Sequence, residues 1–275
     1  MAMPEHLVLV RHGQSEANVV QKTFKRDPAA APPDGFFDRH DSETRLSPKG
    51  RAQARAAGDW LRQHGLAQFD RYYVSPHVRT LETAAALALG GDWTIDLRWR
   101  ERDWGEFGVL NQVDRELRFD LSHKLKEQNK WYWCPPGGES LATGVHGRFR
   151  GILDTLHREA AGQRVIAVTH GEMIDVARFV LERLTPQQWL DQDADGAYAV
   201  RNCQILHYTR RDPGTGRLSS RLRWMRAICP WNDEHSWRSG AWAEIQPRRF
   251  SDAELLEMVR GYPPLLGEEE PHRAP

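Results

Sequence analysis

The sequence LVLVRHGQSEAN, residues 7–18, combines a short apolar run with an arginine and a histidine placed directly after it. Leu7–Val10 is too short and too uniformly apolar for a surface helix, which predicts a strand buried on both faces. Ser15 is a favourable N-cap residue and predicts that a helix follows the strand. We therefore expect Arg11 and His12 at the carboxyl end of a central strand, where open α/β sheets bind their ligands.

The rest of the chain repeats this alternation of strand and helix. Three more strands are predicted in apolar or β-branched stretches, at residues 70–74, 93–97 and 165–168. Serine residues provide the start signals of three predicted helices, at Ser47-Pro48, Ser75-Pro76 and Ser140. Strands that alternate with helices predict a three-layer α/β sandwich with a mostly parallel central sheet.

The pattern changes toward the end of the chain. The segments CQILHYT (203–209) and RLRWMRAI (221–228) flank a turn-rich stretch and predict a β-hairpin at the sheet edge. We predict a catalytic domain over residues 1–230 and a C-terminal extension over residues 231–275, which is rich in tryptophan and carries a helix signal at 251–260.

The catalytic domain also contains a long polar and proline-bearing insertion at residues 19–46. Connections of this length inside a compact domain are usually functional lids or disordered segments. The insertion is therefore a candidate for contact with a ligand.

Basic side chains follow three of the predicted strands. Arg11 and His12 follow the first, Arg79 lies about one turn into the helix that begins after Ser75, and His170 directly follows the strand at 165–168. Arginines and protonated histidines that lie close together repel one another unless an anion lies between them. The N-terminus of each following helix also favours an anion. The pattern therefore predicts a phosphate site.

The two residue types suit different steps of phosphate chemistry. Arginine binds phosphate oxygens in bidentate fashion but does not lose its proton, so it cannot attack phosphorus. A neutral imidazole can attack and form a phosphohistidine, and a second histidine can donate to the phosphoryl oxygens in the transition state. The leaving alkoxide then needs a proton from a carboxylic acid. The stretch RWRERDWGEFG contains three candidates, Glu101, Asp103 and Glu106, and the chemistry alone does not decide among them.

These stretches resemble the histidine phosphatase superfamily, the phosphoglycerate mutase-like proteins. RHGQSEAN is similar to the signature Arg-His-Gly-x-Ser-x-x-Asn of that family. Further segments resemble the family in the expected order, namely LSPKGRAQA (46–54), VSPHVRTLETA (74–84), ERDWGEF (101–107), GGES (137–140) and VTHGE (168–172). The resemblance covers about residues 5–185 and implies a phosphoglycerate mutase-like fold.

The resemblance also implies roles for the matching positions. His12 is then the phosphorylated nucleophile and Glu101 the proton donor. The implied phosphate pocket consists of Arg11, Asn18, Arg79, His170 and Gly171, with Ser15 as a further candidate. The family works without a metal or another cofactor, and we predict none here. The other histidines, His40 and His77 among them, are predicted to lie at the surface or to serve packing.

Three departures from the family's commonest pattern bear on the substrate. The insertion contains Lys25 and Arg26, which either reach a second anionic group of the substrate or remain in solvent. Asn111 and Gln112 stand where glycolytic mutases carry a lysine that holds the carboxylate of phosphoglycerate, which weakens the mutase interpretation. Glu172 follows the second histidine closely and is a rival proton donor, although a favourable interaction with its own helix N-terminus explains it without chemistry.

Three functions are compatible with these residues. The first is metal-independent hydrolysis of the phosphate ester of a small metabolite, through a phosphohistidine. The second is a phosphoglycerate mutase-type transfer by the same intermediate. The third is a non-catalytic relative that binds a phosphorylated ligand or a protein, for which the tryptophan-rich extension is the supporting feature.

Composition restricts the partners. The chain has 38 basic and 38 acidic residues, which argues against nucleic acid or an acidic membrane as a partner. It has three cysteines without a CxxC spacing, no signal peptide pattern and no apolar stretch long enough to span a bilayer. We therefore expect a soluble cytoplasmic protein. A homo-oligomer is compatible with the sequence, although no feature supports one.

Overall fold

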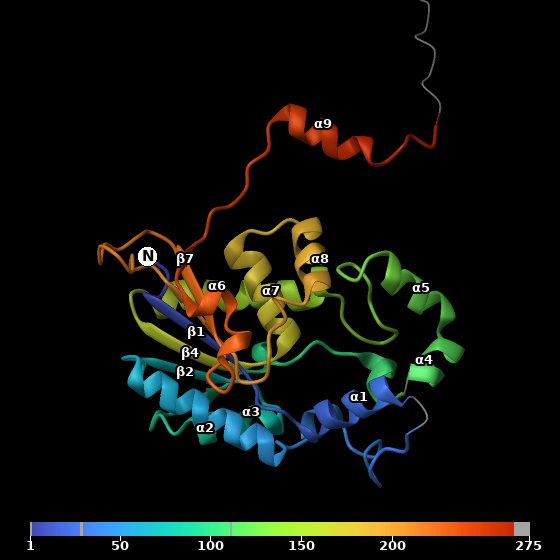
Figure 1. The fold of residues 1–275 in the computed structure, drawn as a ribbon, viewed down its shortest axis with the longest axis horizontal. Helices are drawn as coiled ribbons and strands as arrows, with labels where there is room; N and C mark the ends of the chain where they lie inside the picture. Colours follow the sequence, from blue (N-terminus) through green and yellow to red (C-terminus); the bar gives the residue numbers. More distant parts are fainter. Residues whose placement is uncertain (1, 28–29, 111, 267–275) are drawn as a thin grey trace, which may run out of the picture.

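The computed structural model describes residues 2–27, 30–110 and 112–266, which form an α/β fold around a mixed sheet of seven strands (Figure 1). The strands are β1 His6–Arg11, β2 Arg71–Val74, β3 Trp93–Ile95, β4 Arg164–Thr169, β5 Ile205–Thr209, β6 Trp224–Ile228 and β7 Ala243–Glu244. The α-helices are α1 Glu16–Arg26, α2 Pro48–Gln63, α3 Val78–Leu87, α4 Gln112–Arg118, α5 Asp120–Gln128, α6 His146–Glu159, α7 Gly171–Glu182, α8 Pro186–Asp195 and α9 Asp252–Arg260.

The sheet has a parallel half and an antiparallel half. Its strand order is β3-β2-β4-β1-β5-β6-β7; the pairs among the first four are parallel, and those from β1 onward to β7 are antiparallel. The predicted mostly parallel sheet is thus only partly right. The predicted hairpin of β5 and β6 is confirmed, but it does not form the sheet edge, because β7 pairs with β6 beyond it.

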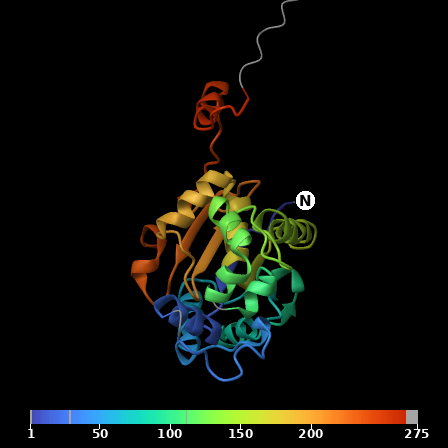
Figure 2. The ribbon, with the colours of Figure 1, turned by 90° about the vertical axis from the view of Figure 1, so that its right-hand side faces the viewer.

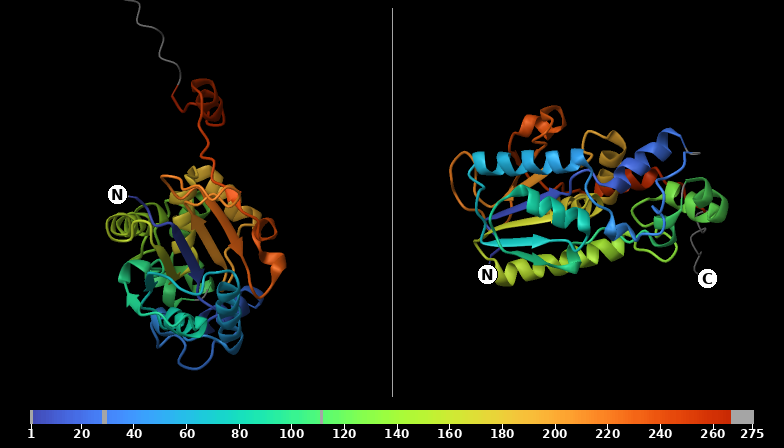
Figure 3. Two further views of the ribbon diagram at one scale, coloured as in Figure 1. Left: turned by 90° about the vertical axis from the view of Figure 1, so that its left-hand side faces the viewer. Right: turned by 90° about the horizontal axis from the view of Figure 1, so that it is seen from below.

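Two apolar cores cover the two faces of the sheet. Val8 and Val10 of β1 pack with α2 and α3 on one face, whereas Leu7 and Leu9 pack with α6 and α7 on the other. This is the alternation expected of a strand that is buried on both faces. Figure 3 shows the resulting three layers, with α2 and α6 on opposite sides of the strands.

Several helix starts follow the predictions and one does not. Ser47 accepts a hydrogen bond from the backbone of Gly50 at the start of α2, and Ser140 caps the helical turn that leads into α6. Ser75 does not cap α3, whose N-cap residue is His77. The Ser75 side chain is instead used in the active site described below.

The insertion begins as a helix rather than as an irregular connection. Ser15 caps α1 in a capping box with Asn18, and the helix continues to Arg26. Ala17 and Val20 lie on the buried face of this helix. The helix predicted after Ser15 is confirmed, but it extends further into the 19–46 connection than expected, because most of its residues are polar and exposed and give no apolar spacing that marks its length.

The C-terminal region divides into a packed part and a projecting part. Trp237 and Ile245 belong to the core on the α6 side of the sheet, so the chain beyond residue 231 still packs on the body. Ser251 caps α9 in a capping box with Glu254, at the predicted helix signal, and none of the side chains of α9 is buried. Figures 1 and 2 show α9 standing away from the rest of the molecule. No helix in the described part of the chain is both long and apolar enough to cross a membrane.

Candidate active site

The register of β1 and β4 brings two histidines together. Arg11 lies opposite Thr169 in this parallel pair, so His12 and His170 are the next residue on each strand. The backbone N–H of His12 donates to the carbonyl oxygen of Thr169 at 2.9 Å, and the centroids of the two imidazole rings lie 5.2 Å apart. The sheet itself therefore places both rings at the carboxyl end of the parallel strands.

His12 is held in a defined tautomer. Its Nδ1 lies 2.7 Å from the carbonyl oxygen of Gly13, and because a carbonyl oxygen only accepts, Nδ1 carries the proton. Burial, followed by the positive charges of Arg79 and Arg11, holds the pKa of His12 well below its usual value. The ring is therefore neutral near pH 7, with the lone pair on Nε2.

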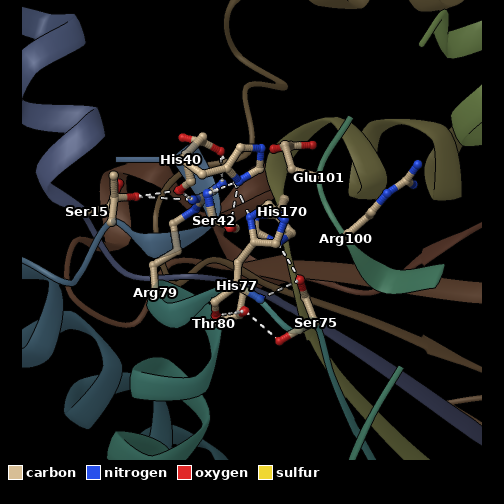
Figure 4. Close-up of polar contacts among 12 residues, drawn as sticks. Ser15, His40, Ser42, Ser75, His77, Arg79, Thr80, Arg100, Glu101 and His170 are labelled. Carbon is tan, nitrogen blue, oxygen red and sulfur yellow. Dashed lines mark hydrogen bonds and ion pairs between the residues drawn. The ribbon is translucent and has the colours of Figure 1, made fainter. Parts of the chain in front are cut away.

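His170 is oriented by a residue of a different strand. Ser75, the residue after β2, lies with its Oγ 2.8 Å from Nε2 of His170, as Figure 4 shows. The Nδ1 atom of His170 is buried and has no hydrogen-bond partner in the described structure. Burial and the nearby Arg79 hold the pKa of His170 well below its usual value. The ring thus keeps one nitrogen that is not used by any described neighbour.

Replacement of Ser75 by alanine is expected to lower kcat/KM about fivefold to tenfold, which is what one positioning hydrogen bond is worth. Ser75 holds the His170 ring at Nε2. The measurement is steady-state kinetics on a phosphate ester, together with the melting temperature. Ser220→Ala, at an exposed serine before β6, is the matched control. An unchanged kcat/KM in Ser75→Ala would show that His170 needs no such support.

Two arginines flank the histidines. The guanidinium of Arg11 donates to the carbonyl oxygen of Val200 at 2.5 Å, and its Nε has no partner among the described residues. A Cβ atom added at Gly171 would lie 3.4 Å from this guanidinium, so the glycine keeps the space beside Arg11 open. Arg79 is only 3% exposed and reaches the same site from the first turn of α3.

Arg79 is bound by a residue of the insertion that the sequence did not single out. Its Nη2 lies 2.8 Å from the carboxylate of Asp41, and its Nη1 donates to the carbonyl oxygen of Asp41 at 2.6 Å. The Asp41 side chain is 40% exposed. A phosphate group that binds Arg79 therefore shares this guanidinium with Asp41, or displaces its carboxylate.

Asn18 and Ser15 form part of a supporting network. The Oδ1 atom of Asn18 accepts from the backbone N–H of Ser15 at 3.2 Å and from the amide of Asn202 at 3.0 Å. Asn202 also donates to the carbonyl oxygen of His12 at 3.1 Å. Asn202 was not predicted, because it lies before β5, far along the chain from the residues it supports.

Two further histidines, which the sequence assigned to the surface or to packing, also line the cavity. His77 is 8% exposed, and its ring centroid lies 4.6 Å from that of His170. Burial and the charge of Arg79 lower its pKa to about 4. His40 lies in the insertion next to Asp41 and also lines the cavity. Figure 4 shows His40, His77, Arg79 and His170 gathered together.

Both candidate proton donors lie in the site. Burial raises the pKa of Glu101, although the positive charges of Arg79 and Arg11 act against this shift. Burial, with the charge of Glu101, raises the pKa of Glu172 to about 7. Glu172 faces Arg102, whose Nη1 lies 3.5 Å from its Oε1. Glu101 thus interacts with the charges of Arg11 and Arg79, whereas Glu172 contacts Arg102.

The site opens into a cavity of about 930 Å³. Arg11, His12, Ser15, Asn18, Arg79, Glu101, Gly171 and Glu172 all line it. Lys25 of α1 lines it too, whereas Arg26 is exposed and lies outside the described wall. The predicted site residues other than Arg26 and the fully buried His170 are therefore in its wall. Asn111 lies outside the described residues, and no group of three or more potential metal ligands occurs within them.

Comparisons with known proteins agree with this geometry. The family model "Histidine phosphatase superfamily (branch 1)" matches residues 7–213. The 2,3-bisphosphoglycerate-dependent phosphoglycerate mutase of Azorhizobium caulinodans is 33% identical over 192 residues, which cover 67% of this chain and 85% of the relative. The mutase of the same name from Methylobacterium radiotolerans is 34% identical over 193 residues, or 68% of this chain and 83% of the relative.

Solved structures of phosphatases share the fold. A mycobacterial glucosyl-3-phosphoglycerate phosphatase, solved with VO3, is similar with a TM-score of 0.57 and 25% identity, over 74% of this chain and 92% of that one. Phosphoserine phosphatase of Entamoeba histolytica, in complex with 3-phosphoglyceric acid, has a TM-score of 0.57 at 20% identity, over 74% and 90% of the two chains. The family match, the two mutase relatives and the shared fold together show that this chain belongs to the histidine phosphatase superfamily, branch 1.

Proposed function

We propose that this protein hydrolyses phosphate monoesters through a phosphohistidine formed on His12, without a metal ion. One observation carries the proposal: the neutral ring of His12 has its proton fixed on Nδ1 by Gly13, which leaves Nε2 free beside Arg11 and Arg79. A nucleophile with a free lone pair next to two permanent cations is suited to attack a phosphate group.

The reaction has two displacements at phosphorus. Nε2 of His12 attacks the phosphorus atom, an N–P bond forms and the ester P–O bond breaks, while the departing oxygen takes a proton from Glu101. Water then attacks the phosphohistidine and gives a proton to the Glu101 carboxylate, and the N–P bond breaks to release inorganic phosphate. Arg11, Arg79 and His170 donate to the phosphoryl oxygens during both steps.

Glu101 is assigned the proton transfer on its position. Its charge interacts with Arg11 and Arg79, and burial raises its pKa, so a proton is available at a higher pH than for an exposed glutamate. Glu172 has a pKa raised to about 7, but its ion-pair contact is a long one of 3.5 Å to Arg102 rather than one to Arg11 or Arg79. Geometry takes precedence over pKa in choosing a proton donor, because the acid must reach the departing oxygen.

Basic residues in the cavity wall support a substrate with a second anionic group. Lys25, Arg115 and Lys126 line the cavity from α1, α4 and α5. The Lys126 ammonium lies 5.4 Å from the ring centroid of Trp133, and burial lowers its pKa. A cluster of cations in a partly enclosed site favours an anionic ligand.

The second candidate activity is that of the mutase relatives, which are named for phosphoglycerate mutase activity. Identities of 33% and 34% to proteins of that name favour it. A mutase must retain a small intermediate and exclude water. A cavity of about 930 Å³ is large for a triose phosphate and leaves room for water, which supports hydrolysis. The phosphatase of similar fold at 25% identity has a larger, glucosyl-bearing substrate in its name, which agrees with this preference.

The test compares the two activities on one preparation. Hydrolysis of p-nitrophenyl phosphate is followed from about pH 5 to 8 with EDTA present, and isomerisation of 3-phosphoglycerate is measured with and without 2,3-bisphosphoglycerate. Ester hydrolysis that persists in EDTA, with isomerisation slower than hydrolysis, is the expected result. Isomerisation that depends on the bisphosphate and exceeds hydrolysis would instead establish the mutase, and neither activity would contradict both.

A further inference from the structure

Helix α7 carries two carboxylates that the reaction does not use. Glu172 and Asp175 lie three residues apart, a spacing that places them on the same face of the helix. Both line the active-site cavity, and the charge of Asp175 interacts with that of Arg11. They therefore line the same cavity as His12 and Arg79.

Both carboxylates lack strong partners. Oε2 of Glu172 is buried without a hydrogen bond in the described structure, and its Oε1 has only a long contact of 3.5 Å to Arg102. Arg102 already donates to the carbonyl oxygens of Glu139 and Trp133, at 2.6 and 3.0 Å. Among the described residues, none donates a hydrogen bond to the carboxylate of Asp175.

The cations nearest Asp175 have partners of their own. Arg178 binds Glu182 on its own helix. The ammonium of Lys130 lies 2.9 Å from both carboxylate oxygens of Asp193. Arg11 faces the phosphate pocket. Burial raises the pKa of Asp175 to about 6, although the charges of Arg178, Lys130 and Arg11 act against this shift.

Carboxylates in a partly desolvated site are stabilised by hydrogen-bond donors, and a ligand that supplies them gains affinity. The donors are hydroxyls or an ammonium group. Nine Lys and Arg side chains and six carboxylates line the cavity, so its net charge is positive before substrate enters. A positive cavity disfavours a ligand ammonium, whereas neutral hydroxyls bring no charge.

The geometry points to a substrate whose alcohol part carries free hydroxyls close to the phosphate ester, as in a sugar or polyol phosphate, with Glu172 and Asp175 accepting their hydrogen bonds. This inference rests on the proposed hydrolysis at His12 and names the substrate class of the same site. It makes Asp175 a specificity-determining residue. Lys25, Arg115 and Lys126, which line the same cavity, suit a further anionic group on this substrate.

Three six-carbon esters test the inference: n-hexyl phosphate, sorbitol 6-phosphate and 6-aminohexyl phosphate. They share the phosphate and the chain length, and differ in carrying no donor, hydroxyls or an ammonium group. For the wild type, we expect kcat/KM to be about tenfold or more higher for sorbitol 6-phosphate than for hexyl phosphate. In Asp175→Asn the ratio of these two values is expected to fall about tenfold. Asp154→Asn, at an exposed carboxylate on α6, is the matched control and should leave both values unchanged.

The melting temperature of the ligand-free protein provides a second measurement. Asp175→Asn is expected to raise it at pH 8, because the substitution removes an unpaired carboxylate. A lower melting temperature with equal losses on all three esters would show a structural role and overturn the inference. A wild-type preference for the aminohexyl ester would overturn the choice of hydroxyls. If the wild type cleaves hexyl phosphate as well as sorbitol 6-phosphate, the inference fails while the proposed function stands; cleavage of none of the three would contradict the proposed function itself.

Discussion

Replacement of His12 by alanine is expected to lower the turnover of any phosphate ester by at least about 10,000-fold, because the substitution removes the atom that attacks phosphorus. Arg11, Arg79 and His170 remain in place and still bind phosphate. The variant should therefore bind a phosphate analogue such as vanadate while it fails to turn over substrate. Steady-state kinetics and a vanadate titration by calorimetry measure the two properties separately.

Trapping of the intermediate makes this prediction specific. Wild-type protein mixed with a ³²P-labelled ester and quenched in base should retain acid-labile, base-stable label, and His12→Ala should retain none. His64→Ala is the matched control, since His64 is an exposed histidine at the end of α2 that stacks on Trp60. Label retained in His12→Ala would place the nucleophile on another residue and contradict the proposed mechanism.

The site is predictable from the sequence where short segments determine it. The apolar runs before His12 and His170 predict strands, and the parallel pairing of two such strands aligns their carboxyl ends. The side chains that follow them then meet by topology alone. Arg79 follows the same logic through the helix after β2. Each of these placements depends on local pattern and on one general property of α/β sheets.

The parts that were missed depend on contacts across long stretches of chain. Asp41 of the insertion binds Arg79 of α3, and Asn202 supports His12 from a segment 190 residues away. Ser75 has the sequence of an N-cap, but its hydroxyl bonds to His170 on a neighbouring strand. A serine hydroxyl can bind either a neighbouring backbone group or a side chain far along the chain. The residue type is the same in both cases, so the sequence does not show which partner is used.

The antiparallel pairing of β5 with β1 and the strand β7 were missed for a related reason. The helix that follows a strand indicates a parallel crossover, and this rule held as far as β4. The chain then runs through α7 and α8 and returns as β5 beside β1, in the opposite direction. The position and direction in which β5 joins the sheet depend on its packing against the rest of the core. The apolar pattern of β5 alone does not predict them.

Glu101→Gln tests which carboxylate gives up the proton. The substitution keeps the size and hydrogen-bonding capacity of the side chain but removes the acid. For an ester of an ordinary alcohol, kcat is expected to fall by about 100-fold to 10,000-fold, the range that general acid catalysis contributes. For p-nitrophenyl phosphate the fall should be much smaller, because nitrophenolate departs without a proton. The comparison of the two substrates isolates proton transfer from binding.

The pH dependence has a definite direction. The first step needs His12 neutral and Glu101 protonated. The pKa of His12 lies well below its usual value and that of Glu101 is raised, so activity should fall on the alkaline side as Glu101 ionises. In Glu101→Gln this alkaline limb should disappear for the alkyl ester, while in Glu172→Gln it should remain. If the limb and the dependence on leaving group are instead lost in Glu172→Gln, the proton comes from the carboxyl with a pKa of about 7, and the assignment of Glu101 is wrong. The two variants thus show which property selects the catalytic acid. Loss of the limb in Glu101→Gln points to the carboxyl that interacts with the two arginines, and its loss in Glu172→Gln points to the carboxyl with the higher pKa.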